Sequence, residues 1–314
     1  MYKQFFHLET EPFTINPDPR FLCMMPHTRE ALACLQHGIA SRKGFMVLTG
    51  EVGTGKTTLL RHTLNALHRT RIHSAFIFNP RLDIIDFLEF VLNDFGLTPV
   101  SRNKSTMIIQ LNRWLIDRYR EGEICVIVVD EAQNCSWELL EEIRLLTNLE
   151  TSSQKLAQIV LSGQPELEDK LRQPNVRQLR QRIALWCRTK PLTLTQTSEY
   201  IAGRLRIAGS TADIFLPDAV ELIHKASHGI PRVINLICEN ALIFAYVDQF
   251  RQVPASVAYA AIQDLNLEDN TSMLYDSAAK ERSSPFAARD LVLQPTPAAG
   301  SRPANVDEPK GKSS

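Results

Sequence analysis

The chain has 314 residues, of which 44% are hydrophobic, so it is long enough to bury a core and to form two domains. Lysine plus arginine number 35, as do aspartate plus glutamate, so the net charge is zero. The chain therefore lacks the overall positive charge that is typical of nucleic-acid-binding proteins. The six cysteines are scattered without a Cys-x-x-Cys pair, which favours free thiols in a reducing compartment over metal or disulfide sites.

The first elements alternate between strands and helices. Residues 1–30 are rich in phenylalanine and proline and have poor periodicity, which predicts an extended segment rather than a helix. Short apolar stretches predict strands over 45–48, 74–80, 124–133, 156–167 and 183–192. Helical spacing is found over 28–39, from 58 onward, and over 83–95, 105–120 and 137–149. Apolar strands that alternate with helices predict an α/β fold, a parallel sheet with helices on both faces.

After residue 191 the strand patterns stop. Helical patterns follow over 195–208, 217–228, 231–246 and 254–265. Beyond about residue 270 the composition turns to serine, alanine, proline and lysine, which predicts a disordered tail. The sequence thus predicts an extended N-terminal segment, an α/β core, a small all-helical lid and a disordered tail, over 1–30, 31–191, 192–268 and 269–314 respectively.

A glycine-rich loop lies between the first strand and its helix, in "GFMVLTGEVGTGKTTLL". Gly50, Gly55, Lys56 and Thr57 meet the pattern G-x-x-x-x-G-K-[ST]. Glycines let consecutive N–H groups face a phosphate, the helix N-terminus attracts the same anion, the lysine reaches the β/γ-phosphates and the threonine ligates Mg²⁺. This predicts a site for ATP and Mg²⁺. Its loop residues are Gly50, Glu51, Val52, Gly53, Thr54, Gly55, Lys56, Thr57 and Thr58.

Two acids end the third strand. Ligands of open parallel sheets bind at the carboxyl ends of the strands, so Asp130 and Glu131 are expected to meet the glycine-rich loop. We expect Asp130 to join Thr57 in holding Mg²⁺, and Glu131 to polarise the attacking water. An acidic helix start is the structural alternative. A helicase is disfavoured, because the chain is too short for two such domains.

Further polar residues stand near the same sheet edge. Gln164 follows the fourth strand and could bind the γ-phosphate or the water, or be an ordinary turn residue. Arg177, Arg180 and Arg182 precede the fifth strand, where one of them could enter a neighbour's site or simply belong to a solvated basic face. Arg232 begins a lid helix, where a cation is unfavourable unless it meets an anion, so we expect it to bridge to the γ-phosphate.

Taken together, these motifs resemble AAA+ ATPases. Five segments carry a narrower resemblance: "FFHLETEPFTINPDPRFL", "LTGEVGTGKTT", "DEAQNCSWELLEEIRLLTNLE", "IVLSGQPEL" and "LRQRIAL". They resemble the ExeA/GspA family of general-secretion-pathway ATPases, and the resemblance covers residues 1 to about 268. The resemblance implies a P-loop core with a helical lid. It assigns the Walker A pair to Lys56 and Thr57, the Walker B pair to Asp130 and Glu131, sensor 1 to Gln164, the arginine finger to Arg180 or Arg182, and sensor 2 to Arg232.

The resemblance also implies partners. Secretion members continue into a transmembrane helix and a peptidoglycan-binding domain, for which this sequence shows no counterpart, and shorter relatives accompany exopolysaccharide and exosortase loci. We therefore expect a cytoplasmic homo-oligomer, or one peripheral at the inner membrane, that couples ATP hydrolysis to a membrane-associated secretion or export protein. The alternative resembles the MuB/TniB transposition ATPases and would bind DNA through a stripe of Arg172, Arg177, Arg180 and Arg182. A non-hydrolysing switch is disfavoured by Glu131.

Overall fold

The computed structural model describes residues 1–14, 19–67, 71–78 and 80–267. These residues all belong to one compact unit, so the boundary expected between residues 191 and 192 stays a prediction. The tail expected over 269–314 lies outside the described residues.

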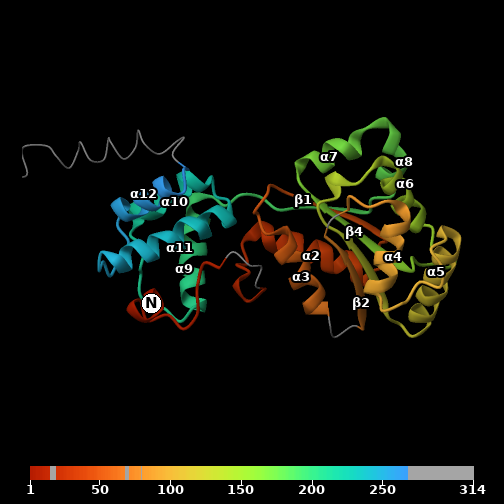
Figure 1. Ribbon diagram of the computed structural model, residues 1–314, viewed down its shortest axis with the longest axis horizontal. Coiled ribbons are helices and arrows are strands. Elements are labelled where there is room, and N and C mark those ends of the chain that lie inside the picture. The colour runs from red at the N-terminus through yellow and green to blue at the C-terminus, as the bar shows by residue number, and fades with distance from the viewer. Residues whose placement is uncertain (15–18, 68–70, 79, 268–314) are drawn as a thin grey trace, which may run out of the picture. The chain divides into compact units, whose positions relative to one another are not determined.

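Within the described residues, a five-stranded sheet forms the centre of the α/β part (Figure 1). Its strand order is β2-β3-β4-β1-β5, and every neighbouring pair is parallel, which confirms the predicted parallel sheet. The carboxyl ends of the strands therefore share one edge, where the segments after β1, β3 and β4 meet. The strands are β1 (Phe45–Thr49), β2 (Ile72–Ile77), β3 (Ile124–Val129), β4 (Ala157–Gly163) and β5 (Leu185–Arg188).

Helices cover both faces of this sheet, as predicted (Figure 1). Successive side chains of a strand point to opposite faces, so β1 contributes Phe45 and Val47 to one apolar core and Met46 and Leu48 to the other. The first core includes residues of α4 (Ile84–Asp94), α5 (Lys104–Arg120), α6 (Trp137–Leu146), α7 (Pro165–Arg172) and α8 (Arg177–Arg180). The second core includes residues of α2 (Pro26–Ala40) and α3 (Lys56–Ala66).

The segment after the sheet is helical, as expected. It consists of α9 (Leu194–Ile207), α10 (Pro217–Ser227), α11 (Pro231–Val247) and α12 (Ala255–Asp264). The side chain of Thr193 caps the start of α9 in a capping box with Gln196. Proline at the first helical position begins both α10 and α11, because its fixed φ suits a helix and its missing N–H would have no helical partner there.

The N-terminal segment differs from its extended prediction. It contains a short helix, α1 (Tyr2–Phe5), and a 3₁₀ turn, η1 (Pro19–Phe21), and α2 begins at Pro26 rather than at residue 28. The segment is anchored on the lid helices: Glu9 N–H donates to the Ala208 carbonyl over 2.8 Å, and the Tyr2 hydroxyl donates to Glu239 over 2.7 Å. Tertiary contacts of this kind carry no periodic signal in the sequence.

Four strand predictions were too long. The expected strands 74–80 and 124–133 end at Ile77 and Val129, and a 3₁₀ turn, η3 (Ala132–Asn134), follows the second of them. The expected strand 156–167 ends at Gly163, because Pro165 starts α7 with acidic residues in its first turn, where they favour a helix. The expected strand 183–192 is limited to β5, and α8 precedes it. No helix among the described residues is both long enough and apolar enough to span a membrane.

Candidate functional site

The glycine-rich loop runs from the end of β1 to the start of α3. Gly53 and Gly55 have φ of 81° and 91°, a left-handed conformation that glycine adopts without steric cost. At Gly50 an added Cβ would lie 2.0 Å from Oγ1 of Thr189 on the neighbouring β5 side, so no larger residue fits. The backbone of this loop is therefore shaped by the two motif glycines, Gly50 and Gly55, together with Gly53.

The loop lysine is buried within this turn. Lys56 is only 6% exposed, and its Nζ donates to the carbonyl oxygens of Gly50 over 2.7 Å and Glu51 over 3.0 Å. Burial lowers the pKa of Lys56, and the nearby carboxylates of Glu131 and Asp130 oppose this effect. The predicted cation and the two predicted acids thus lie close enough to interact.

Asp130 is the polar centre of the sheet edge. Its Oδ2 accepts from the Thr57 hydroxyl over 2.8 Å, which joins the loop to the acid across 73 positions of sequence. Its Oδ1 accepts from the hydroxyl of Ser162 over 2.7 Å, and Ser162 is fully buried at the end of β4. Sequence reasoning missed Ser162, although a serine that directly follows the apolar run Ile159–Leu161 is a usable signal.

Glu131 has an unusual backbone and two amide partners. Its φ is 53°, the left-handed region that a non-glycine residue rarely adopts and that clusters at functional sites. Its Oε2 accepts from Nε2 of Gln133 over 2.6 Å and from Nε2 of Gln164 over 3.1 Å. The structure therefore brings Gln164 to Glu131, and it adds Gln133, which sequence reasoning did not select.

A cavity of about 410 Å³ opens beside the loop. The loop from Val52 to Leu59, Glu131 and Arg232 all line it. Arg232 approaches the loop directly, because its N–H donates to the Gly53 carbonyl over 3.2 Å and a Cβ added to Gly53 would lie 2.8 Å from its Cβ. Further lining residues come from the N-terminal segment and the lid; among them are Phe21, Leu22, Met25, Tyr200, Arg204 and Asn235.

Arg204 connects the N-terminal segment to the lid wall of this cavity. It is 6% exposed, its Nη1 donates to the Tyr200 hydroxyl over 2.8 Å, and its Nε donates to the Pro12 carbonyl over 2.5 Å. Its guanidinium also lies over the ring of Phe21, 4.7 Å from the centroid. The N-terminal segment thus forms a wall of the cavity, which sequence patterns did not indicate.

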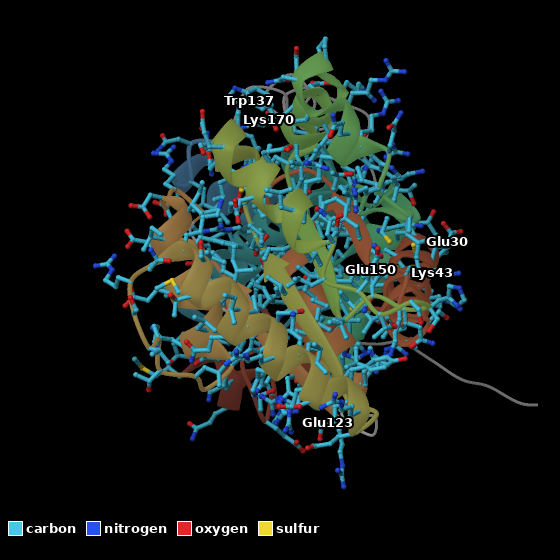
Figure 2. All side chains as sticks on the ribbon, turned by 90° about the vertical axis from the view of Figure 1, so that its right-hand side faces the viewer. Glu30, Lys43, Glu123, Trp137, Glu150 and Lys170 are labelled. Atoms are coloured by element: carbon cyan, nitrogen blue, oxygen red, sulfur yellow. The ribbon has the colours of Figure 1, made fainter. Side chains whose placement is uncertain are left out.

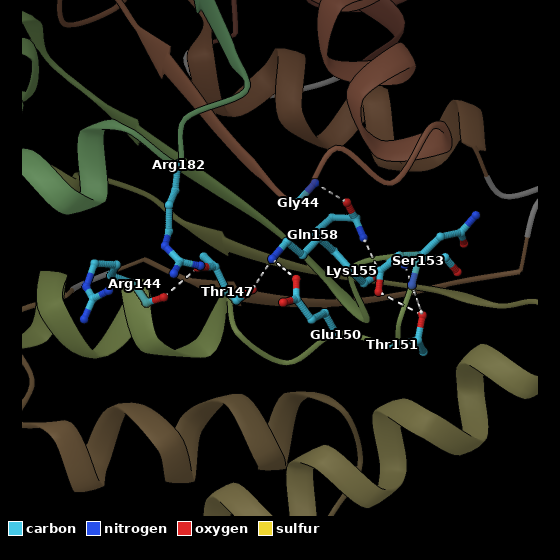
Figure 3. Close-up of polar contacts among 10 residues, drawn as sticks. Gly44, Arg144, Thr147, Glu150, Thr151, Ser153, Lys155, Gln158 and Arg182 are labelled. Atoms are coloured by element: carbon cyan, nitrogen blue, oxygen red, sulfur yellow. Dashed lines mark hydrogen bonds and ion pairs between the residues drawn. The ribbon is translucent and has the colours of Figure 1, made fainter.

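The arginines before β5 do not line this cavity. Arg182 turns to the loop after α6, where its Nη1 donates to Thr147 Oγ1 over 3.0 Å (Figure 3). Arg180 lines a separate hollow of about 330 Å³, which we call the arginine hollow; its other lining residues are Glu168, Arg172, Trp186 and Arg188. The predicted stripe is therefore split, with Arg172 and Arg180 in the hollow and Arg182 outside it.

The donor set suits Mg²⁺ only in combination with a phosphate ligand. Among the described residues, no group of three or more histidine, cysteine, aspartate or glutamate side chains could hold a metal. Thr57 Oγ1 and Asp130 Oδ2 nevertheless offer two adjacent oxygens. Mg²⁺ is commonly bound by one or two protein oxygens, with phosphate and water oxygens as the other ligands.

Comparison with known proteins identifies the chain's relatives. Residues 39–171 match a family model described as an AAA domain. The chain is 42% identical over 272 residues to general secretion pathway protein A of Aeromonas hydrophila, covering 86% of this chain and 49% of that protein. It therefore spans about half the length of the curated relative it matches.

Two solved structures share this fold at low sequence identity. The Aeropyrum pernix ORC2 protein in its ADPNP-ADP complexes has a TM-score of 0.62 at 18% identity, over 81% of this chain and 71% of that one. The Thermotoga maritima RuvB Holliday junction branch migration motor has a TM-score of 0.53 at 16% identity, over 78% and 71% of the two chains. At these identities the likeness shows the fold, which is the AAA fold expected from the motifs.

Proposed function

Because the chain is an AAA protein related to general secretion pathway protein A, we propose that it binds ATP with Mg²⁺ and hydrolyses it to ADP and phosphate. The observation that carries the proposal is the hydrogen bond between Thr57 and Asp130, with Lys56 and Glu131 beside it. It joins a phosphate-binding loop to the acids of a second strand at one sheet edge, which is the arrangement that phosphoryl transfer needs.

Each residue has one role in the proposed reaction. The loop N–H groups and Lys56 bind the β- and γ-phosphates. Thr57 and Asp130 hold Mg²⁺, which supplies positive charge to the phosphate oxygens. Glu131 orients and polarises the attacking water, Gln164 lies beside it, and Arg232 reaches from the lid toward the same cavity.

Nucleotide binding is tested by a lysine pair. Lys56→Ala removes the buried charge that faces the phosphates, so we expect ATP binding measured by calorimetry to be lost. Lys43→Ala removes an exposed lysine just before β1 and should leave binding unchanged. Equal ATP affinity of both variants would overturn the assignment of the loop.

Hydrolysis is tested by a glutamate pair. Glu131→Gln removes the water-polarising carboxylate but keeps Asp130, so ATP should still bind while turnover falls. Glu30→Gln, at an exposed position of α2, should behave like the wild-type protein. A Glu131→Gln variant that hydrolyses ATP at the wild-type rate would remove Glu131 from the reaction and favour a non-hydrolysing switch.

The cellular role we propose is energy coupling in an envelope secretion or export system. Its support is the relationship to general secretion pathway protein A, combined with the position of the glycine-rich loop and the two acids within the matched region. The partner is then a membrane-associated secretion or export protein, bound by a homo-oligomer of this chain at the inner membrane. A pull-down from membranes with ATP and with ADP tests this role, since nucleotide-dependent capture of an export component is expected. Capture that does not depend on nucleotide would contradict it.

One observation favours the alternative, a DNA-binding ATPase. The arginine hollow combines three guanidinium groups with the half-exposed indole of Trp186 and only one carboxylate, Glu168. Cations beside an aromatic ring are typical of nucleic-acid contacts. Fluorescence anisotropy with labelled DNA, compared between wild type and Arg172→Ala, separates the two functions. Binding that falls with salt and with the substitution would favour the DNA function over the export function.

A further inference from the structure

Only one carboxylate oxygen of Glu131 accepts hydrogen bonds from side chains of the described residues. Both glutamine amides donate to Oε2, over 2.6 Å from Gln133 and 3.1 Å from Gln164. The second oxygen, Oε1, accepts no hydrogen bond within the described part of the chain, and Glu131 lines the cavity beside the phosphate loop. The two oxygens of one carboxylate are thus divided between an anchored side and an open side.

Gln133 is itself fixed in place. Its Oε1 accepts from the N–H of Gln164 over 3.2 Å, and its carbonyl oxygen accepts from Nζ of Lys170 on α7 over 3.0 Å. Lys170 also donates to the Cys135 carbonyl and lies 4.7 Å from the ring centroid of Trp137, beside which it stands in Figure 2. The segment from Gln133 to Trp137 is therefore tied to α7.

Gly163 leaves room for this amide. A Cβ added to Gly163 would lie 2.7 Å from Oε1 of Gln133, closer than real Cβ contacts allow. The end of β4 is thus shaped to admit the Gln133 side chain. Close packing of this kind restricts the rotamers of Gln133 before any ligand binds.

We propose that Gln133 is a positioning residue, which holds Glu131 through Oε2 so that Oε1 is presented to the cavity. This inference rests on the proposed ATP hydrolysis and names a residue that the reaction needs without touching substrate. Without the Gln133 amide, the Glu131 side chain would sample more rotamers. Fixing it in the reactive orientation would then cost more conformational entropy at each turnover. Gln164 gives the second donor, so the two glutamines act through the same oxygen.

The main test is Gln133→Met, which keeps the length of the side chain and removes the N–H donor to Glu131 together with the oxygen that accepts from the Gln164 N–H. A hydrogen bond to a charged group is lost, so we expect kcat to fall about tenfold. KM and the calorimetric affinity for ATP should stay within about twofold, because Gln133 does not line the cavity. The matched control is Gln110→Met on α5, whose amide bonds the backbone of Thr98 and Val100 and which should leave kcat unchanged.

A coupling measurement separates positioning from a structural role. In single-turnover assays, Gln133→Met should add no further loss to Glu131→Gln, since it acts only through the carboxylate. Gln133→Glu, a second variant of the same shape, places an acceptor against Oε2 and should lower kcat further than Gln133→Met does. Additional loss in the Glu131→Gln background, or a rise in KM equal to the fall in kcat, would overturn the proposal. If the wild-type protein hydrolyses ATP and Gln133→Met has the same kcat, the positioning role of Gln133 is wrong and the proposed function stands. If the wild-type protein does not hydrolyse ATP, the proposed function is wrong as well.

Discussion

Arg182 donates from Nη1 to the Thr147 hydroxyl over 3.0 Å, although the two residues are 35 positions apart. Thr147 in turn donates to the Arg144 carbonyl over 2.6 Å, so Arg182 is held against the end of α6 (Figure 3). Arg180 has no such anchor among the described residues and lines the arginine hollow. Of the two arginines expected to act in a neighbouring subunit, Arg180 is therefore the one free to do so.

We predict that Arg180→Ala lowers turnover about 10³-fold, the usual effect of losing an arginine that a neighbour supplies. Arg182→Ala should lower the melting temperature instead and change turnover little. Mixing Arg180→Ala with Lys56→Ala protein should restore part of the activity, because a mixed interface pairs an intact loop with an intact arginine. Specific activity that stays flat on dilution, while sedimentation shows a monomer throughout, would rule out this shared site.

Ser162→Ala tests the hydroxyl group that donates a hydrogen bond to the Asp130 carboxylate. The substitution removes the hydroxyl that donates to Oδ1 of Asp130 over 2.7 Å and leaves that buried oxygen with one partner fewer. Loss of a residue that orients a metal ligand commonly costs about 10- to 100-fold in metal affinity or activity. We therefore expect the Mg²⁺ concentration for half-maximal ATPase rate to rise about tenfold. Ser74→Ala, on the exposed side of β2, is the control, and an unchanged Mg²⁺ dependence of Ser162→Ala would contradict the role of Asp130.

Gly53→Ala tests the contact between the loop and the lid. Gly53 and Gly122 have similar positive φ, 81° and 76°, so alanine should destabilise both by about 1 kcal/mol. Only at Gly53 would the added Cβ meet Arg232, since nothing lies within 4 Å of a Cβ at Gly122. We expect the affinity for ATP to fall in Gly53→Ala and to stay unchanged in Gly122→Ala. The melting temperatures of both variants are measured in parallel. Equal affinities would show that Arg232 does not approach the loop when ATP binds.

Glu168→Gln tests an acid that joins α7 to β1 and β5. The Arg188 guanidinium, 2.8 Å away, and the Thr49 hydroxyl, 2.5 Å away, hold the pKa of Glu168 below its usual range. A carboxyl whose folded pKa is depressed stabilises the fold above its unfolded pKa and loses this contribution as pH falls through the folded pKa. At pH 7 the variant should be less stable by about 1–2 kcal/mol, measured by urea denaturation. The difference should narrow below about pH 4; a constant difference would mean that charge is not involved.

Local chemistry was readable from the sequence. The glycine-rich loop needs a glycine at Gly55 because its φ is positive, and the motif marks that position. Gly53 also has a positive φ but occupies a position that the motif leaves open. The apolar runs of β1 and β3 predicted buried parallel strands, which the sheet confirms. The acids at the end of β3 and the loop after β1 were expected to meet, and Thr57 and Asp130 do. These features were predictable because backbone conformation and burial follow from residues close in sequence.

The tertiary structure decided which side chains serve these acids. Ser162 reaches Asp130 because the strand order sets β4 beside β3, and hydrophobic periodicity does not encode that order. Gln133 and Gln164 meet at Glu131 across 31 positions, and Phe21 joins the cavity through the packing of the N-terminal segment on the lid. By itself the sequence determined the local backbone of the loop and the residue types from which we predicted the site. Only the fold decided how its residues are oriented, because that depends on contacts between segments distant along the chain.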